Sequence, residues 1–126
     1  MSAIRVVNFD HQFSTFNDYW SPRISGELNE NYVKLAKLKG EFVWHHHEQE
    51  DEMFLVIRGN LRMGIRENGA ERELTIHPGE YVIIPRGVEH LPIADEEVHL
   101  VMIEPKTTIN TGNLRNERTR EELPSI

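Results

Sequence analysis

Three consecutive histidines, His45, His46 and His47, stand directly before an acidic run and form the part of the chain best suited to chemistry. The acidic run contains Glu48, Glu50, Asp51 and Glu52. Imidazole and carboxylate ligands together suit a divalent transition metal, such as zinc, manganese, iron, nickel or copper, better than calcium, which prefers oxygen alone. The chain has no cysteine, so a metal here would be held by nitrogen and oxygen.

The spacing of the histidines agrees with a shared metal. Residues 42–44 and 53–57 are good strand formers, which predicts a strand, an acidic turn and a returning strand. Alternate side chains of a strand face the same side, so His45 and His47 can share one ion while His46 faces away. On the same argument, Phe42 and Trp44 face away from the metal.

A carboxylate could complete the site from the returning strand. Glu52 continues the alternating face of Phe54 and Val56, and we therefore prefer it to its neighbour Asp51 as the ligand. A further candidate lies about forty residues on, where residues 79–90 predict a turn, a strand, a tight Pro-Arg-Gly turn and then His90.

At this point the chain resembles a known family, the cupins. The first cupin motif is matched by Gly40, His45, His47, Glu52 and Gly59, with one residue fewer than usual after the first glycine. The second motif is matched by Gly79, Pro85, Gly87 and His90, and its final asparagine position holds Ala94. The resemblance covers roughly residues 31–104.

The resemblance implies an all-β fold, an antiparallel jelly-roll β-barrel, with His45, His47, Glu52 and His90 gripping one divalent metal inside. Three histidines and a glutamate leave one or two positions of such an ion open, which is typical of catalytic rather than structural sites. Short cupins of this pattern are similar to proteins described as mannose-6-phosphate isomerase-like.

The chain of 126 residues is expected to form a single domain with three parts. Residues 1–30 are an aromatic N-terminal arm, with a strand predicted over residues 4–9 and a helix over 14–20. The arm is expected to cover the barrel or a partner subunit, and the alternative is a lid over the pocket. Residues 31–104 form the barrel. Residues 105–126 are a polar C-terminal tail, extended or partly disordered, with a helical turn near 117–123.

Within the barrel, the pattern predicts a strand over residues 31–39, where three lysines indicate a sheet edge. An amphipathic strand over residues 61–66 is then joined to a returning strand over residues 71–76 by an Asn68-Gly69 turn. Residues 81–84 are apolar throughout, which predicts a strand buried on both faces, and residues 98–103 form the last strand.

Charge and hydropathy limit the partners. With 14 basic and 21 acidic residues the net charge is −7, which opposes nucleic-acid binding. No apolar run approaches the roughly 20 residues of a membrane span, and no secretory signal is evident, so we expect a cytoplasmic protein. Strands at 42–44 and 53–57 that are apolar on both faces indicate a second layer, and a homodimer would supply it.

Two further residues are candidates for catalysis. Arg86 follows Pro85 in the turn beside His90 and could anchor an anion, although an exposed turn arginine is the simpler interpretation. His99 is most simply a hydrogen-bonded strand histidine, and the alternatives are a fifth metal ligand or a catalytic base. The leading hypothesis is a metal-dependent enzyme acting on a small polar metabolite, a sugar or organic acid, in an isomerase-like reaction. The alternatives are a metal-dependent dioxygenase and a non-catalytic small-molecule binder.

Overall fold

The computed structural model describes residues 4–126, and in this range β-strands account for nearly all regular structure. The elements are α1 (Phe9–Phe13), β1 (Arg23–Leu28), β2 (Asn31–Glu41), β3 (Glu52–Arg58), β4 (Leu61–Glu67), β5 (Ala70–Ile76), β6 (Tyr81–Ile84) and β7 (Glu89–Pro105). All strand pairings are antiparallel. Among the described residues, no helix has the length and apolarity to cross a membrane.

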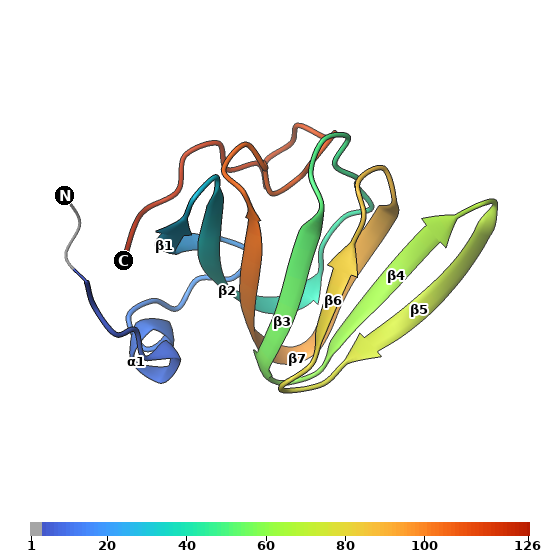
Figure 1. The fold of residues 1–126 in the computed structure, drawn as a ribbon. Helices are drawn as coiled ribbons and strands as arrows, with labels where there is room; N and C mark the ends of the chain where they lie inside the picture. The colour runs from blue at the N-terminus through green and yellow to red at the C-terminus, as the bar shows by residue number, and fades with distance from the viewer. Residues whose placement is uncertain (1–3) are drawn as a thin grey trace.

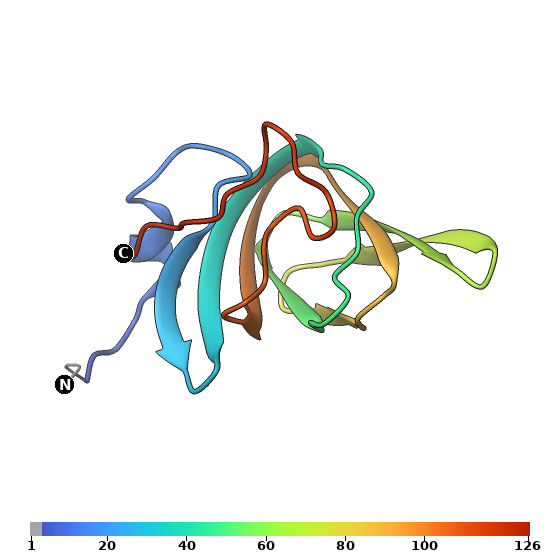
Figure 2. The same cartoon turned by 90° about the horizontal axis from the view of Figure 1, so that it is seen from above.

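The long strand β7 organises the sheet. Its strands run in the order β1-β2-β7-β3-β6, and the β4–β5 hairpin is attached through a pairing of β4 with β7. The strands curve around a common interior, as in a jelly roll, but the sheet is not closed (Figure 2). The β4–β5 hairpin projects from one side, and α1 lies near the opposite side (Figure 1). The expected all-β fold with an antiparallel jelly-roll arrangement is confirmed.

Two apolar clusters lie on the two faces of this sheet. The interior cluster draws on β2, β3, β4, β5, β6 and β7 and includes Leu38, Phe54, Val56, Met63 and Leu100. The second cluster lies between the outer face and the arm, where Phe13 and Phe16 pack with Leu35 and Val101. Alternate residues of one strand therefore serve different clusters, as the pleat requires.

The N-terminal arm differs from its prediction. Residues 4–8 form no strand, and the helix spans Phe9–Phe13 instead of residues 14–20. The side chain of Asn8 caps this earlier helix by accepting a hydrogen bond from the His11 backbone N–H at 3.0 Å. The arm also contains β1, which sequence reasoning did not identify and which forms the sheet edge beside β2.

Two strand environments were predicted wrongly. Strand β2 is not an edge but lies between β1 and β7, and its Lys34 and Lys37 are buried. Each finds a polar partner: Lys34 contacts Glu104, and Lys37 donates to the Phe16 carbonyl. Strand β6, expected to be buried on both faces, is a sheet edge that leaves Tyr81 and Ile83 more than half exposed.

The C-terminal tail folds back on the barrel as turns without a helix. Its end forms a bridge between Ser125 and Ile24 of β1, and the Ile24 backbone N–H donates to the Pro124 carbonyl at 2.9 Å. The arm and the tail thus meet on one side of the sheet (Figure 1).

Candidate metal centre

The histidine run lies on an irregular segment rather than on a strand. Residues 42–51 follow the end of β2 without regular pairing, apart from a bridge between His45 and His90. The two residues exchange backbone hydrogen bonds of 3.1 and 2.9 Å, and the Gly87 N–H donates to the His47 carbonyl at 2.8 Å. These bonds preserve the alternation that sets His45 and His47 on the same side.

Backbone carbonyls orient two of the imidazoles. The Nδ1 atom of His45 lies 2.9 Å from the Val43 carbonyl oxygen, and Nδ1 of His90 lies 3.0 Å from that of Val88. A carbonyl only accepts, so each Nδ1 must carry the proton. The unprotonated Nε2 atoms are left as ligands, which is the tautomer and support typical of metal-binding histidines.

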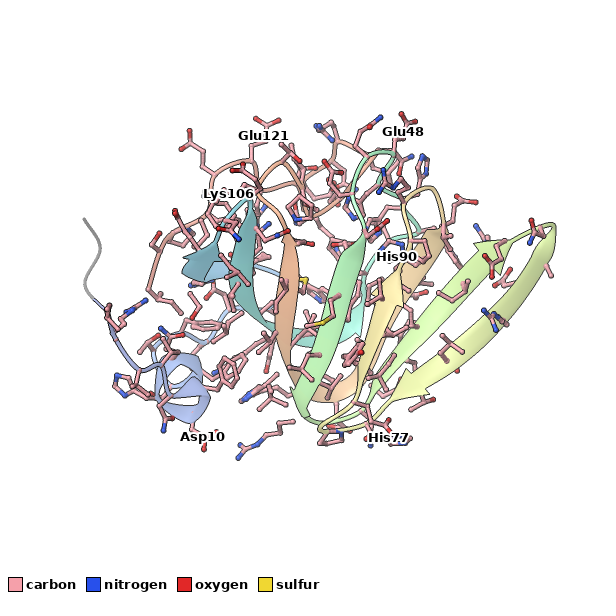
Figure 3. The ribbon with its side chains drawn as sticks, viewed as in Figure 1. Asp10, Glu48, His77, His90, Lys106 and Glu121 are labelled. Atoms are coloured by element: carbon pink, nitrogen blue, oxygen red, sulfur yellow. The ribbon has the colours of Figure 1, made fainter. Side chains whose placement is uncertain are left out.

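Glu52, the first residue of β3, closes the group. Its Oε1 atom lies 2.7 Å from Nε2 of His47 and 3.1 Å from Nε2 of His90. One potential ligand atom from each of His45, His47, Glu52 and His90 lies within 4.8 Å of the other three, and all four residues are buried. His90 lies inside the barrel below the rim that carries Glu48, while His77 lies at the opposite end (Figure 3).

The donor set fits a transition metal. The Nε2 atom of His47 is buried without a hydrogen-bond partner, because its contact with Glu52 lacks hydrogen-bond geometry. Burying an unpaired polar nitrogen is costly, and a cation among the three imidazoles would remove that cost. His45, His47, Glu52 and His90, termed the metal group, could therefore hold one metal ion.

The protonation states of these residues also suit a bound cation. Burial, followed by the neighbouring His90, lowers the pKa of His45 to about 3, so its imidazole is neutral at physiological pH. Burial alone would raise the pKa of Glu52, but its contacts with Glu104, His47 and His90 outweigh burial and hold that pKa well below its usual range. Neutral imidazoles and an ionised carboxylate are the protonation states that metal binding needs.

A second buried carboxyl group, Glu104, lies beside Glu52. The β3–β7 register pairs Met53 with Ile103, which sets Glu52 opposite Glu104 on the interior face. Glu104 is 2% exposed, and its Oε1 accepts from Lys34 Nζ at 2.7 Å. Burial and the negative charge of Glu52 raise the pKa of Glu104 well above its usual value.

A small cavity of about 40 Å³ adjoins the metal group. Its lining is mostly apolar and draws on the arm, the barrel and the tail: Trp20, Pro22, Ala36, Leu38, Phe42, His45, Glu52, Phe54, Pro92, Leu100, Met102, Glu104 and Asn110. Trp20 and Phe42 stack with ring centroids 4.8 Å apart. Phe42 was expected to face away from the metal, but it is buried with its ring 5.4 Å from that of His45.

A second, polar hollow of about 530 Å³ opens at the rim beside His47. It is lined by His47, Glu48, Gln49, Glu50, Thr107, Ile109, Gly112, Asn113 and Arg115. The tail forms much of this wall and is joined to the histidine segment by two hydrogen bonds. The Asn113 N–H donates to the His46 carbonyl, and the His46 N–H donates to Asn113 Oδ1.

The remaining candidates lie elsewhere. His99 faces the second apolar cluster, where its ring stacks on Phe13 at 4.5 Å and its Nε2 lies 2.7 Å from Glu97. Arg86 is exposed in its turn, and its backbone N–H donates to Asp51, which is therefore engaged away from the metal group. Neither His99 nor Arg86 lines the cavity.

Comparison with known proteins identifies the family. Residues 31–104 match the model of the Cupin_2 family, described as a cupin domain. The chain belongs to the cupin domain family. A solved cupin-2 domain protein from Shewanella frigidimarina is 46% identical and superposes with a TM-score of 0.76, covering 80% of this chain and 95% of that one.

Two curated relatives widen the comparison. This cupin is 33% identical over 64 residues to the uncharacterised protein YdbB of Bacillus subtilis, which covers 51% of this chain and 54% of YdbB. It is 27% identical over 93 residues to a 3-hydroxyanthranilate 3,4-dioxygenase of Xenopus tropicalis, covering 68% of this chain and 32% of that enzyme. The chain thus spans about half the length of the first relative and a third of the second.

Proposed function

We propose that this cupin is a metal-dependent dioxygenase acting on a small hydroxylated aromatic compound. The observation that carries the proposal is the apolar cavity beside the metal group, because its lining offers Trp20 and Phe42 to a ring and no lysine or arginine to a phosphate. The similarity to 3-hydroxyanthranilate 3,4-dioxygenase supports the same choice over an isomerase-like reaction.

The residues have distinct tasks in this proposal. His45, His47, Glu52 and His90 would hold the ion, which, if redox-active, supplies the reactivity toward dioxygen that no protein side chain offers. Their burial excludes bulk water from the reacting position. The carbonyls of Val43 and Val88 keep the Nε2 atoms directed inward.

The cavity must open for a ring to enter. At about 40 Å³ it is smaller than the roughly 150 Å³ that accommodates benzene in a protein core. Trp20 is the wall residue best placed to move, since it belongs to the arm and its backbone has the unfavourable φ of 57°. The arm would then be a lid as well as a cover.

Oxygen uptake tests the proposal. Protein purified without a polyhistidine tag is stripped of metal, reconstituted with Fe²⁺ and supplied with a panel of catechols, hydroquinones and aminophenols in an oxygen electrode. We expect uptake with at least one compound and ring-opened product by mass spectrometry. Absence of uptake across the panel with stoichiometric iron, compared with the His47→Ala protein, would refute the dioxygenase assignment.

The polar hollow beside His47 favours a second candidate, a ligand binder or isomerase-like enzyme for a sugar or organic acid. Glu48, Glu50 and Asn113 offer hydrogen bonds there, and Arg115 offers a positive charge. Zinc-loaded protein would then bind a polar metabolite without consuming oxygen. Incubation with a metabolite extract followed by mass spectrometry separates turnover from simple binding.

We also propose that the protein forms a homodimer through the outer face of β3 and β6. Tyr81 and Ile83 are 62% and 52% exposed there, and the register places them beside half-buried Leu55 and Met53. Exposed apolar groups in one patch favour association. Light scattering after size-exclusion chromatography should give twice the 14.7 kDa chain mass, and Ile83→Lys should reduce it to one chain.

A further inference from the structure

Glu104 is an acidic residue near the end of β7, and no sequence motif explains it. Its carboxyl group is buried, yet it lines the cavity together with His45 and Glu52. Isolated carboxylates are costly to bury, so a glutamate in this position calls for partners that satisfy both of its oxygen atoms.

Within residues 4–126, only one of these oxygen atoms has such a partner. Lys34 Nζ lies 2.7 Å from Oε1, and the ammonium group is itself buried, with a second and longer contact of 3.4 Å to the Thr108 carbonyl. The Oε2 atom is buried and receives no hydrogen bond from any donor of the described chain. Lys34 thus fixes the carboxyl group and leaves one acceptor unsatisfied.

The other polar side chains of the cavity wall, outside the metal group, are already engaged. Trp20 donates its indole N–H to the Lys39 carbonyl at 2.8 Å. Asn110 donates to the Arg118 carbonyl and accepts from the Arg120 N–H, both at 2.8 Å. Glu104 Oε2 is therefore the acceptor that this wall can offer to a ligand.

We propose that Glu104 determines specificity by accepting a hydrogen bond from a hydroxyl or amino group of the ligand in the cavity, with Lys34 as its positioning residue. The inference rests on the proposed function in placing the ligand in this cavity, and it adds the group that the ligand must carry. An apolar ring would contact Trp20 and Phe42, while a donor substituent would reach Glu104 next to the metal group. A site with few, well-placed polar groups discriminates strongly against ligands that lack the matching donor.

The test compares phenol with toluene, which differ in a hydroxyl against a methyl group. Both are titrated by NMR into zinc-loaded protein, where no oxygen chemistry competes. We expect the wild type to bind phenol about tenfold more tightly than toluene, or better, because the hydroxyl group satisfies a buried oxygen atom that a methyl group leaves unpaired. The double variant Lys34→Met/Glu104→Met, which buries no lone charge, should bind the two compounds equally.

Two further variants test whether the preference for phenol depends on Glu104 itself. Glu104→Gln retains the shape of the side chain and should lower the preference for phenol with zinc content unchanged. Glu96→Gln makes the same chemical change at an exposed position of β7 and should retain the full preference. An unaltered preference in both Glu104 variants, or no binding of phenol by the wild type, would overturn the proposal.

The outcome is separable from that of the oxygen-uptake experiment. A preference for phenol that depends on Glu104, without oxygen consumption in the iron-loaded protein, would refute the dioxygenase assignment and leave the role of Glu104 intact. Oxygen consumption that is equally selective in Glu104→Gln would refute the role of Glu104 alone.

Discussion

His45 and His90 form an isolated antiparallel bridge, with backbone hydrogen bonds of 3.1 and 2.9 Å in the two directions. The bridge joins the irregular segment that follows β2 to the beginning of the long strand β7. It brings together two imidazoles that are 45 residues apart in the chain. The metal group therefore depends on backbone pairing as much as on side-chain identity.

Removing one imidazole of the group should abolish tight metal binding. We expect His90→Ala to lower zinc affinity by more than about 100-fold, because even partners outside the ligand set contribute about 10- to 100-fold. His46→Ala is the matched control, since His46 lies in the same run but outside the group. Isothermal titration with chelator competition measures both, and equal losses in the two variants would argue against the assigned ligands.

Gly112 supports the histidine segment through close contact. A Cβ there would collide with the carbonyl oxygen of His46, and the φ of +56° already disfavours other residues. Gly112→Ala should cost more than the ~1–2 kcal/mol expected for the backbone conformation alone. It should also weaken zinc binding.

Gly69→Ala provides the control for that experiment, because its φ is +73° but a Cβ meets nothing within 4 Å. Urea unfolding gives the two free energies of unfolding. A Gly112→Ala protein no less stable than Gly69→Ala, with unchanged zinc affinity, would show that the tail does not support the site.

Lys34 and Glu104 should behave as a coupled buried pair. Lys34→Met leaves the buried Glu104 carboxyl group without its partner and, because the raised pKa of Glu104 allows that group to be buried as the neutral acid, should cost about 1–3 kcal/mol in the free energy of unfolding. The double change Lys34→Met/Glu104→Met should recover most of that loss, since apolar replacements of buried pairs are often neutral. Thermal and urea unfolding of the single and double variants measure the recovery, and additive losses would contradict this account.

Trp20 should control access to the cavity. Trp20→Ala removes one wall and the stacking on Phe42, so we expect toluene to enter and leave the zinc-loaded protein faster, with weaker binding because the ring loses its contact with the indole. Tyr19→Ala, at the neighbouring exposed position, should leave both rates unchanged. Line-shape analysis by NMR reports both rates, and entry no faster in Trp20→Ala than in the wild type would contradict a barrier at the indole.

The metal-free protein should lose stability in acid through His45. The unfolded chain binds a proton at this residue below about pH 6.5, whereas the folded chain does so only near pH 3. The unfolded state therefore gains protons across this window, and the folded state becomes relatively less stable as pH falls. Between pH 7 and pH 4.5, wild type should lose more stability than His45→Gln, and equal losses would contradict the neutral imidazole.

The four residues of the metal group could be predicted because their positions follow from local rules. Alternation along an extended chain places His45 with His47, and Glu52 begins a strand whose interior face continues through Phe54. The same rule failed at Phe42, because the chain leaves the sheet after Glu41 and the alternation is not continuous between Phe42 and the bridge at His45.

The surroundings of the metal group could not be predicted, because they depend on long-range register. Lys34 and Glu104 meet only when β2 and β7 pair, and they are 70 residues apart in the chain. A signal was present in the sequence, since Lys34 and Lys37 fall within an apolar strand and Glu104 ends another. We interpreted the lysines as residues that protect a sheet edge. Charged residues that recur among otherwise buried positions also indicate polar partners inside the fold.

The C-terminal tail supplies Asn110 to the cavity wall and Asn113 to the histidine segment, yet it lies outside the span that the family model matches. Two homologues with identical ligands can therefore admit different molecules if their last twenty residues differ. Grouping such proteins by these four residues alone would merge proteins with different ligands, and alignments of the terminal segments should separate them better.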